Sequence, residues 1–199
     1  MIASEIISKF NEYKHTPDDD NIKIKNTIKK SLMECDELFY ALHNINLIDY
    51  SDKTLDISTI DKEAFFGREG NIKPYGIIPQ TQIAPINYIC YSVEFKSLIE
   101  GNTFFKYGLI KFDIYCDYRD LDDEFTGIAR HDLLSSIIRE KFNWTNIFGL
   151  QCSIIKNTED VTNKDYASRT LIFEIPEIRN AVQTINGTTR VINNDIVVR

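Results

Sequence analysis

Six acidic residues between positions 113 and 124 are the side chains in this sequence that best suit metal-dependent chemistry. They are Asp113, Asp117, Asp120, Asp122, Asp123 and Glu124. Hard divalent cations bind where several carboxylate oxygens converge, and on an extended strand Asp113 and Asp117 share a face, as a nuclease-type site requires. No lysine follows them at a D-x-K or E-x-K spacing, and acidic connectors commonly form turns and N-caps. A metal-dependent nuclease that uses Asp113 and Asp117 therefore remains only an alternative.

The three histidines predict no catalytic centre. His15, His43 and His131 are far apart in the sequence, and none has a serine or cysteine partner in a recognisable nucleophile motif. His131 precedes Asp132 near the start of an expected helix, where a capping or surface role is more usual than acid–base catalysis. The chain also has no G-x-G-x-x-G sequence and no P-loop. We therefore expect no catalytic, cofactor-binding or metal-binding residues, no cofactor and no enzymatic activity.

The cysteines and the tryptophan are expected inside the fold. Cys35, Cys90, Cys116 and Cys152 include no C-x-x-C pair and lie among apolar neighbours, where a thiol behaves as a small apolar side chain. We predict four buried thiols. Trp144 suits either core packing or an interface anchor, and we favour core packing.

The charge balance favours protein partners over nucleic acid. The 199 residues include 23 Lys and Arg against 30 Asp and Glu, a formal net charge of −7, and the pI is near 5.0. An acidic surface repels phosphates, so we expect no duplex to be bound by phosphate neutralisation. The sequence has no apolar run long enough to span a membrane, and residues 1–5 lack the character of a signal peptide. We expect an unexported protein with no membrane partner.

Three segments have the apolar period of amphipathic helices. They are residues 2–13, residues 26–43 and a segment from about Thr126 to Phe142, with Ile128 on its buried side. The stripe of the second helix consists of Ile28, Leu32, Cys35, Phe39 and Leu42.

Residues 44–87 have no sustained apolar period, and glycines and prolines punctuate their second half. Long irregular segments are usually functional or disordered, and the aromatic and isoleucine content argues against disorder. Two alternatives stay open. The segment folds back on its own domain, or it is an arm that lies on a neighbouring subunit.

Strict alternation of apolar and polar side chains predicts two long antiparallel strands around residues 89–96 and 110–117. Shorter strand signals occur at residues 150–154 and 171–175, separated by a polar loop at 157–165. Pro176 is expected to end the last of these strands.

The C-terminal tail predicts a β-hairpin. Asn186 and Gly187 separate two β-rich runs at residues 181–185 and 188–192, and Asn-Gly favours the type I′ turn of a two-residue hairpin. An isolated hairpin is marginally stable in water, so this one needs the main sheet or another chain as a partner.

Together, these elements predict an α+β fold with a mainly antiparallel sheet and helices on one face, plus an extended arm and a C-terminal hairpin. We divide the chain into an N-terminal helix and acidic turn at 1–25, a core domain at 26–176 that carries the arm at 44–87, and a hairpin or tail at 177–199.

The order of these elements resembles that of the small tail-terminator, tail-completion and neck (head–tail connector) proteins of tailed bacteriophages. The likeness covers about two-thirds of the chain and includes no signature motif. It rests on the helix at 26–43, the strands at 91–95 and 110–116, the helix at 131–138 and the strands at 150–154 and 170–175.

The resemblance implies a structural virion protein, assembled in the host cytoplasm, that forms a ring at the head–tail junction or at the tail end. Proteins of this family have no catalytic residues, and their loops and termini reach into neighbouring subunits. The expected partners are further copies of the chain in a cyclic homo-oligomer and adjacent neck or tail proteins, with DNA passing only through an acidic lumen. A monomeric adaptor is a further alternative.

The expected subunit interface consists of apolar residues in segments that cannot form a core alone, together with the hairpin turn. These are Phe66, Tyr75, Ile77, Ile78, Ile83, Val182, Ile185, Asn186, Gly187, Val191 and Ile192.

Overall fold

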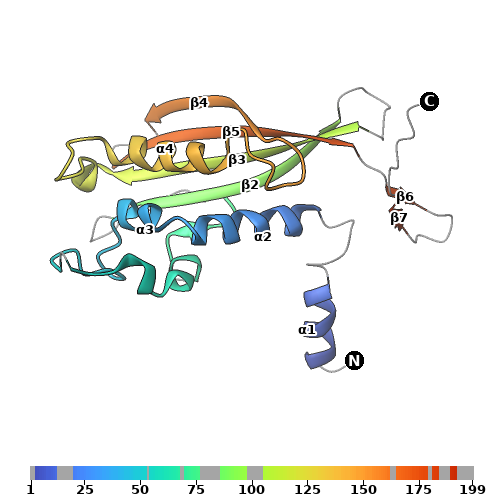
Figure 1. The fold of residues 1–199 in the computed structure, drawn as a ribbon, viewed down its shortest axis with the longest axis horizontal. Helices are drawn as coiled ribbons and strands as arrows, with labels where there is room; N and C mark the ends of the chain where they lie inside the picture. The colour runs from blue at the N-terminus through green and yellow to red at the C-terminus, as the bar shows by residue number, and fades with distance from the viewer. Residues whose placement is uncertain are drawn as a thin grey trace.

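A mostly antiparallel five-stranded sheet forms the body of the protein (Figure 1). The computed structural model describes residues 3–12, 20–52, 54–67, 70–76, 86–97, 105–161, 165–178, 181–183 and 189–191. In sheet order the strands are β1 (Ile72–Lys73), β2 (Tyr88–Ser97), β3 (Phe105–Asp117), β5 (Tyr166–Ile178) and β4 (Ser153–Val161). Among these five strands, only the pairing of β1 with β2 is parallel. The expected α+β class is confirmed.

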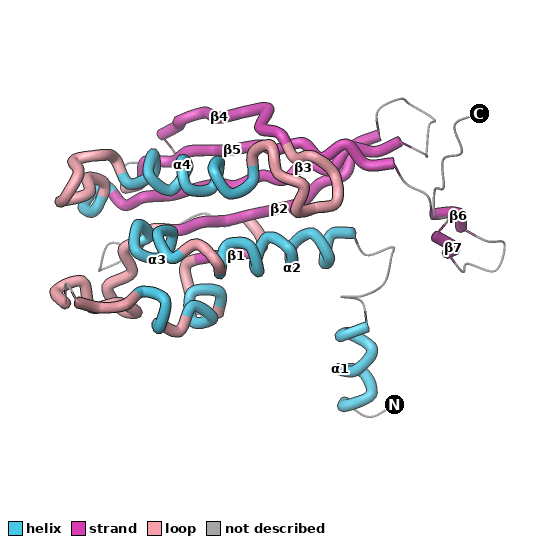
Figure 2. Tube along the Cα trace, viewed as in Figure 1, coloured by secondary structure: helices cyan, strands magenta, loops and turns pink. Residues whose placement is uncertain are grey.

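Helices cover one face of this sheet, as expected. They are α2 (Asp20–Met33), α3 (Asp36–Leu42) and α4 (Arg130–Phe142) (Figure 2). On the central strand β3, Ile110, Phe112 and Ile114 are buried, whereas Lys111 between them is exposed. Because successive side chains of a strand point to opposite faces, this alternation marks the face that the helices cover.

Aromatic packing around Phe112 joins the sheet to α4. The Phe112 ring lies 5.2 Å from Phe142 of α4 and 5.8 Å from Phe173 of β5, between ring centroids. Phe142 and Phe173 are themselves 6.2 Å apart, and Tyr91 of β2 lies 6.1 Å from Phe112. These separations are those of favourable aromatic pairs, so one cluster connects three strands with a helix.

The helix predicted over residues 26–43 is two helices, which corrects its bounds. The predicted stripe is buried throughout, including Cys35. However, Cys35 has non-helical angles (φ −101°, ψ 89°) and stands at the N-cap of α3. Asp36 and Glu37, in the first turn of α3, suit the positive end of a helix dipole and favour a new start there.

The described part of the 44–87 segment packs on its own chain. It contains the 3₁₀ helices η1 (Ile57–Thr59) and η2 (Lys62–Phe66) and strand β1. Phe65 is fully buried, with its ring edge-on to Phe39 at 5.0 Å. Lys62 donates to the carbonyl oxygen of Met33 at 3.0 Å. For residues 44–76, folding back on the same domain is the alternative that these contacts support, and residues 77–85 lie outside the described residues.

Helix α4 begins at Arg130, later than the predicted start near Thr126, because the connector before it forms a turn. The Asp123 carboxylate accepts hydrogen bonds from the backbone N–H and the hydroxyl of Thr126 (2.9 and 2.7 Å), and Asp122 forms an isolated β-bridge with Ala129. A closed turn therefore occupies the residues where the predicted helix began. Ile128, predicted to be buried, is exposed.

Two sequence predictions about β4 and β5 were wrong. Residues 157–161, predicted as loop, continue β4, and β5 extends beyond Pro176 to Ile178. β4 is polar because it is an edge strand with an exposed surface. Its pairing with β5 starts at Ser153 opposite Glu174, so at Pro176 the strand β5 has a neighbour on one side only, where a proline is tolerated.

The β4 edge carries features that oppose further strand pairing. The register shifts between Ile154 and Lys156, as in a β-bulge. Lys156, Glu159 and Asp160 are exposed along the same strand. Bulges and charges are common protections of sheet edges.

Two terminal elements lie apart from the body in Figure 1: helix α1 (Ala3–Glu12) and the two-stranded sheet of β6 (Ala181–Gln183) and β7 (Thr189–Val191). The predicted pairing of the tail is confirmed, but its register is not. Gln183 stands opposite Thr189, whereas a two-residue turn at Asn186-Gly187 would place Gln183 opposite Arg190. The pairing is therefore shifted by one residue from the register of a two-residue turn.

We predict that Phe112→Ala lowers the free energy of unfolding by about 3–5 kcal/mol, because the change leaves a cavity within the aromatic cluster. Urea unfolding followed by circular dichroism measures this loss. Phe125→Ala is the matched control, since Phe125 is 67% exposed and its truncation should cost less than about 0.5 kcal/mol. Equal losses in the two variants would contradict the central role of Phe112.

Candidate interaction groove

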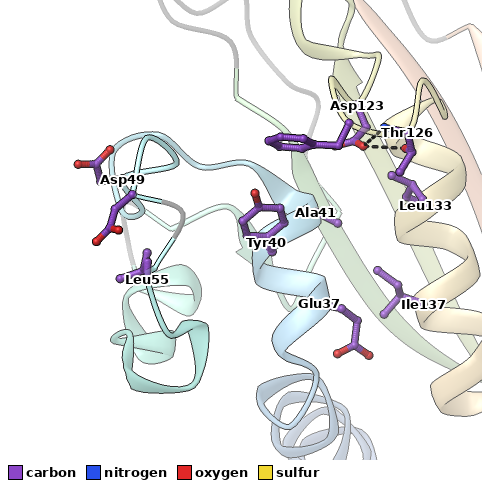
Figure 3. Close-up of a pocket in the computed structure, with 11 residues that line it drawn as sticks. Glu37, Tyr40, Ala41, Asp49, Leu55, Asp123, Thr126, Leu133 and Ile137 are labelled. Atoms are coloured by element: carbon purple, nitrogen blue, oxygen red, sulfur yellow. Dashed lines mark hydrogen bonds between the residues drawn. The ribbon is translucent and has the colours of Figure 1, made fainter.

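An open groove lies between α3 and α4 and extends over α3 to Asp49, Asp52 and Leu55, with the 123–126 turn near the start of α4 (Figure 3). We call it the α3–α4 groove. Its volume is about 470 Å³, within the range of ligand-binding pockets. Glu37 and Tyr40 of α3 stand on one wall, and Leu133 and Ile137 of α4 stand on the other.

The lining of the α3–α4 groove is mainly apolar. Its apolar and aromatic members are Tyr40, Ala41, Leu55, Phe125, Leu133 and Ile137. Phe125 is 67% exposed and Tyr40 is 38% exposed. Exposed aromatic side chains beside a concave apolar surface are typical of interaction sites.

Carboxylates surround this apolar lining. Glu37, Asp49, Asp52 and Asp123 all line the groove, and among the residues that the structure describes no lysine or arginine does so. Hydrogen bonds from the Ser51 hydroxyl and backbone lower the pKa of Asp49, and the same groups of Thr54 lower the pKa of Asp52. These two carboxylates are therefore ionised at neutral pH.

The pKa of Asp123 is also lowered, although burial and its neighbours act on it in opposite directions. Burial acts to raise its pKa, but the hydrogen bonds from Thr126 and the nearby positive charge of Arg130 outweigh burial and lower it. Arg130 Nη1 lies 3.8 Å from Asp123 Oδ1. The negative charge of Asp123 is thus partly balanced from behind the groove, whereas the partners of Asp49 and Asp52 are neutral.

A buried arginine fixes the α4 side of the groove. Arg130, the first residue of α4, is only 3% exposed. Its Nη1 donates to the carbonyl oxygen of Ala41 at 3.1 Å, its Nε donates to the carbonyl oxygen of Asp120 at 3.0 Å, and its Nη2 lies 3.2 Å from Asp120 Oδ1. The start of α4 is therefore bonded directly to the last turn of α3.

The Asp120 carboxylate extends this network to the sheet. It accepts hydrogen bonds from His43 Nδ1 at 2.7 Å and from Asn87 Nδ2 at 2.8 Å. Asn87 Nδ2 also donates to the carbonyl oxygen of Leu42 at 3.1 Å, and Asn87 Oδ1 accepts from the backbone N–H of Asp117 at 3.0 Å. The end of α3, the start of β2 and the end of β3 are joined in this way. Asp120 and His43 thus serve as structural partners in this network.

The two aspartates of the nuclease alternative do not converge. Asp113 accepts from the Thr170 hydroxyl at 2.7 Å and pairs with Lys111 at 2.8 Å. Asp117 accepts two guanidinium hydrogen bonds from Arg119, at 2.9 and 2.6 Å. Four residues of strand place them about 13 Å apart along β3. No group of three or more His, Cys, Asp and Glu side chains within the described ranges is arranged to hold a metal ion.

All four cysteines are buried thiols, as predicted. Burial raises the pKa of the Cys152 thiol to about 12 and also raises the pKa of Cys35 and Cys116. The thiolate is the reactive form. Because a raised pKa disfavours the thiolate, these three thiols should react slowly in the folded chain.

The expected interface residues occupy different environments. Phe66 packs against the core of its own chain, with its ring 6.4 Å from Phe39 and Lys29 Nζ 5.1 Å above it. Tyr75 is exposed. Val182 and Val191 belong to the separate two-stranded sheet. The others lie outside the described residues: Ile77, Ile78, Ile83, Ile185, Asn186, Gly187 and Ile192.

Four exposed apolar side chains follow α4 in the sequence. Trp144 is 67% exposed, contrary to the predicted core position, and Ile147, Leu150 and Ile155 beside it in sequence are also exposed. Trp144 has a φ of 61°, which is uncommon for a large side chain. Its backbone N–H donates to the carbonyl oxygen of Cys152 at 2.7 Å, which holds this conformation. We call these four residues the Trp144 patch.

Sequence reasoning missed the α3–α4 groove because its residues come from distant segments. Phe125 is the one local signal, since it is an aromatic residue inside an otherwise acidic connector. Neither periodicity nor a motif places it in the same groove as Tyr40.

The fold and its surfaces define an α+β protein with an apolar, acidic-rimmed groove. A family model described as YomW matches residues 35–175, and the chain belongs to this family. The family is phage-derived, which indicates a phage origin and confirms the sequence resemblance in that general form. No curated protein matches the chain. None of the described helices is long and apolar enough to cross a membrane.

We predict that Asp117 makes the stability of the protein sensitive to acid. Hydrogen bonds from Arg119 lower its pKa despite burial, which acts to raise it. Because the folded-state pKa lies below the unfolded value of about 3.9, the stabilisation is complete above that value and is lost as the pH falls through the folded-state pKa. Asp117→Asn should therefore destabilise the protein most at neutral pH and progressively less below pH 4.

Urea unfolding between pH 7 and pH 2.5 measures this difference. Asp122→Asn, at an exposed position of the connector, is the control. A destabilisation by Asp117→Asn that stays constant over the whole pH range would contradict the assignment.

Proposed function

We propose that this chain is a structural virion protein that forms a homo-oligomeric ring at the phage head–tail junction or at the tail end. The phage-derived family supports the setting. The observation that carries the proposal is the presence of elements at both ends of the chain that lie apart from the five-stranded sheet (Figure 1).

The small size of the β6–β7 sheet supports a partner outside the sheet body. β6 and β7 have three residues each and pair only with one another among the described strands. A two-stranded hairpin is at best marginally stable in water, and stability requires further strands or packing. A neighbouring subunit supplies such packing when a terminal element is exchanged or laid across an interface.

Helix α1 also has exposed apolar side chains, which is a second reason to expect a neighbouring subunit. In α1, Ile7 and Phe10 are 58% and 59% exposed. They stand three positions apart and so share one side of the helix. An amphipathic helix gains most of its stability from packing its apolar side, and in a ring that packing comes from the next copy.

The acidic character of the chain is compatible with DNA passage. A net charge of −7 repels phosphates, so an acidic lumen lets DNA move through without adhering. The proposed partners are therefore further copies of the chain and adjacent neck or tail proteins, and the proposed location is the virion. No catalytic step is part of this role.

We predict that deletion of residues 181–199 prevents ring assembly but leaves the sheet body folded. Native mass spectrometry and negative-stain electron microscopy of the full chain, over a range of concentrations, should show a closed ring with cyclic symmetry. The truncated chain should be monomeric, with an unchanged thermal transition, because among the described strands the deleted ones pair only with each other. Rings formed equally well without these residues would contradict the role of the hairpin, and monomers under every condition would contradict the proposal.

The single tryptophan reports assembly independently. In the monomer, exposed Trp144 should show the long-wavelength emission of a solvated indole and strong quenching by iodide. We predict that ring formation shifts the emission to shorter wavelength and reduces quenching, because an exposed apolar patch is the kind of surface that a neighbouring subunit covers. Unchanged emission in intact rings would place the Trp144 patch outside the subunit contact.

A further inference from the structure

The α3–α4 groove has the two properties that a peptide-binding surface needs. It is concave and apolar, with Leu133 and Ile137 of α4 on the side toward Ala41 of α3, whereas Tyr40 lies on the side of α3 toward the 49–52 segment (Figure 3). Phe125 stands at its rim with two-thirds of its surface exposed. Apolar grooves between helices commonly receive the apolar side of a partner helix.

The charge around the groove restricts the chemistry of its occupant. Asp49 and Asp52 are ionised at neutral pH, and within the described part of the chain their carboxylates accept hydrogen bonds from neutral groups of Ser51 and Thr54. Glu37 adds a third carboxylate on the α3 wall. Such a rim attracts Lys and Arg and repels phosphates and acidic segments, which disfavours nucleic acid and anionic lipid as ligands.

We propose that the α3–α4 groove binds a basic amphipathic helix of a second, different protein. One or two apolar side chains of that helix lie between α3 and α4, and its Lys or Arg residues lie over the carboxylates of Asp49 and Asp52. This surface is independent of the proposed ring contacts. All of its residues fall within the range that the family model matches, whereas α1 and the β6–β7 hairpin fall outside that range.

Helices of the chain itself fit this groove less well. The described residues of α1 carry Glu5 and Glu12 against one lysine, Lys9, so their charge has the same sign as the rim. The lysine-rich α2 has the required charge, but its Ile28 and Leu32 are buried in its own core and cannot enter a neighbour's groove. A separate protein with a basic, apolar helix satisfies both requirements.

The test is a titration of the full chain into a fluorescein-labelled synthetic helical peptide with leucines along one face and lysines on the other, followed by fluorescence anisotropy. A matched peptide has glutamate in place of every lysine. We expect the lysine peptide to bind, more weakly at high salt, and the glutamate peptide not to bind.

Variants of the protein then locate the binding. Asp49→Asn with Asp52→Asn should weaken binding about fivefold or more, because two attractive rim charges are lost. Phe125→Ala should weaken it roughly tenfold through the lost apolar contact. The control is Asp56→Asn with Asp61→Asn, which removes two carboxylates that also accept backbone N–H hydrogen bonds, from Ser58 and Glu63, but do not line the groove.

Three results would overturn the proposal: no binding of the lysine peptide, equal binding of the glutamate peptide, or equal weakening by the control pair. Tighter binding of a peptide of residues 1–13 would replace the foreign partner with a second copy of the chain. The titration is made at concentrations at which native mass spectrometry reports a single oligomeric state. A failed ring therefore leaves this result interpretable, and a failed titration leaves the ring proposal standing.

Discussion

The burial of one face of β3 is the constraint on which the other parts of the structure depend. Phe112 lies at the centre of that face, and its contacts with Phe142 and Phe173 determine where α4 crosses the sheet. Since α4 forms one wall of the α3–α4 groove, the position of the groove follows from the same aromatic packing. Residues far from any interaction surface thus define the shape of that surface.

The hydrogen bonds around Asp120 fix the relative position of α3 and α4 more narrowly than apolar packing does. Apolar contacts tolerate small sliding movements, whereas a buried guanidinium bonded to Ala41 and Asp120 has few acceptable positions. Asn87 connects the same carboxylate to the sheet. A buried charge is costly unless it is fully paired, and here its pairing sets the separation of α3 and α4.

Much of the fold could be predicted because its central elements are strongly periodic. The alternation along β2 and β3 and the buried stripe from Ile28 to Leu42 were both readable in the sequence. The break at Cys35 was not, since the apolar stripe continues across it and only the backbone angles change. β4 was only partly predicted, because a solvent-exposed edge strand has the polar composition of a loop. Apart from Phe125, the groove had no local signature, because its walls are about 90 residues apart in sequence.

The bulge and charges of β4 bear on how the chain avoids uncontrolled association through its sheet edge. An open sheet can grow without limit by adding strands from other molecules, which produces fibres instead of particles of defined size. The register shift beside Ile154 and the exposed Lys156, Glu159 and Asp160 discourage such growth along the side of the sheet. Any association of copies is thereby left to other surfaces, where geometry can limit the number of copies that join.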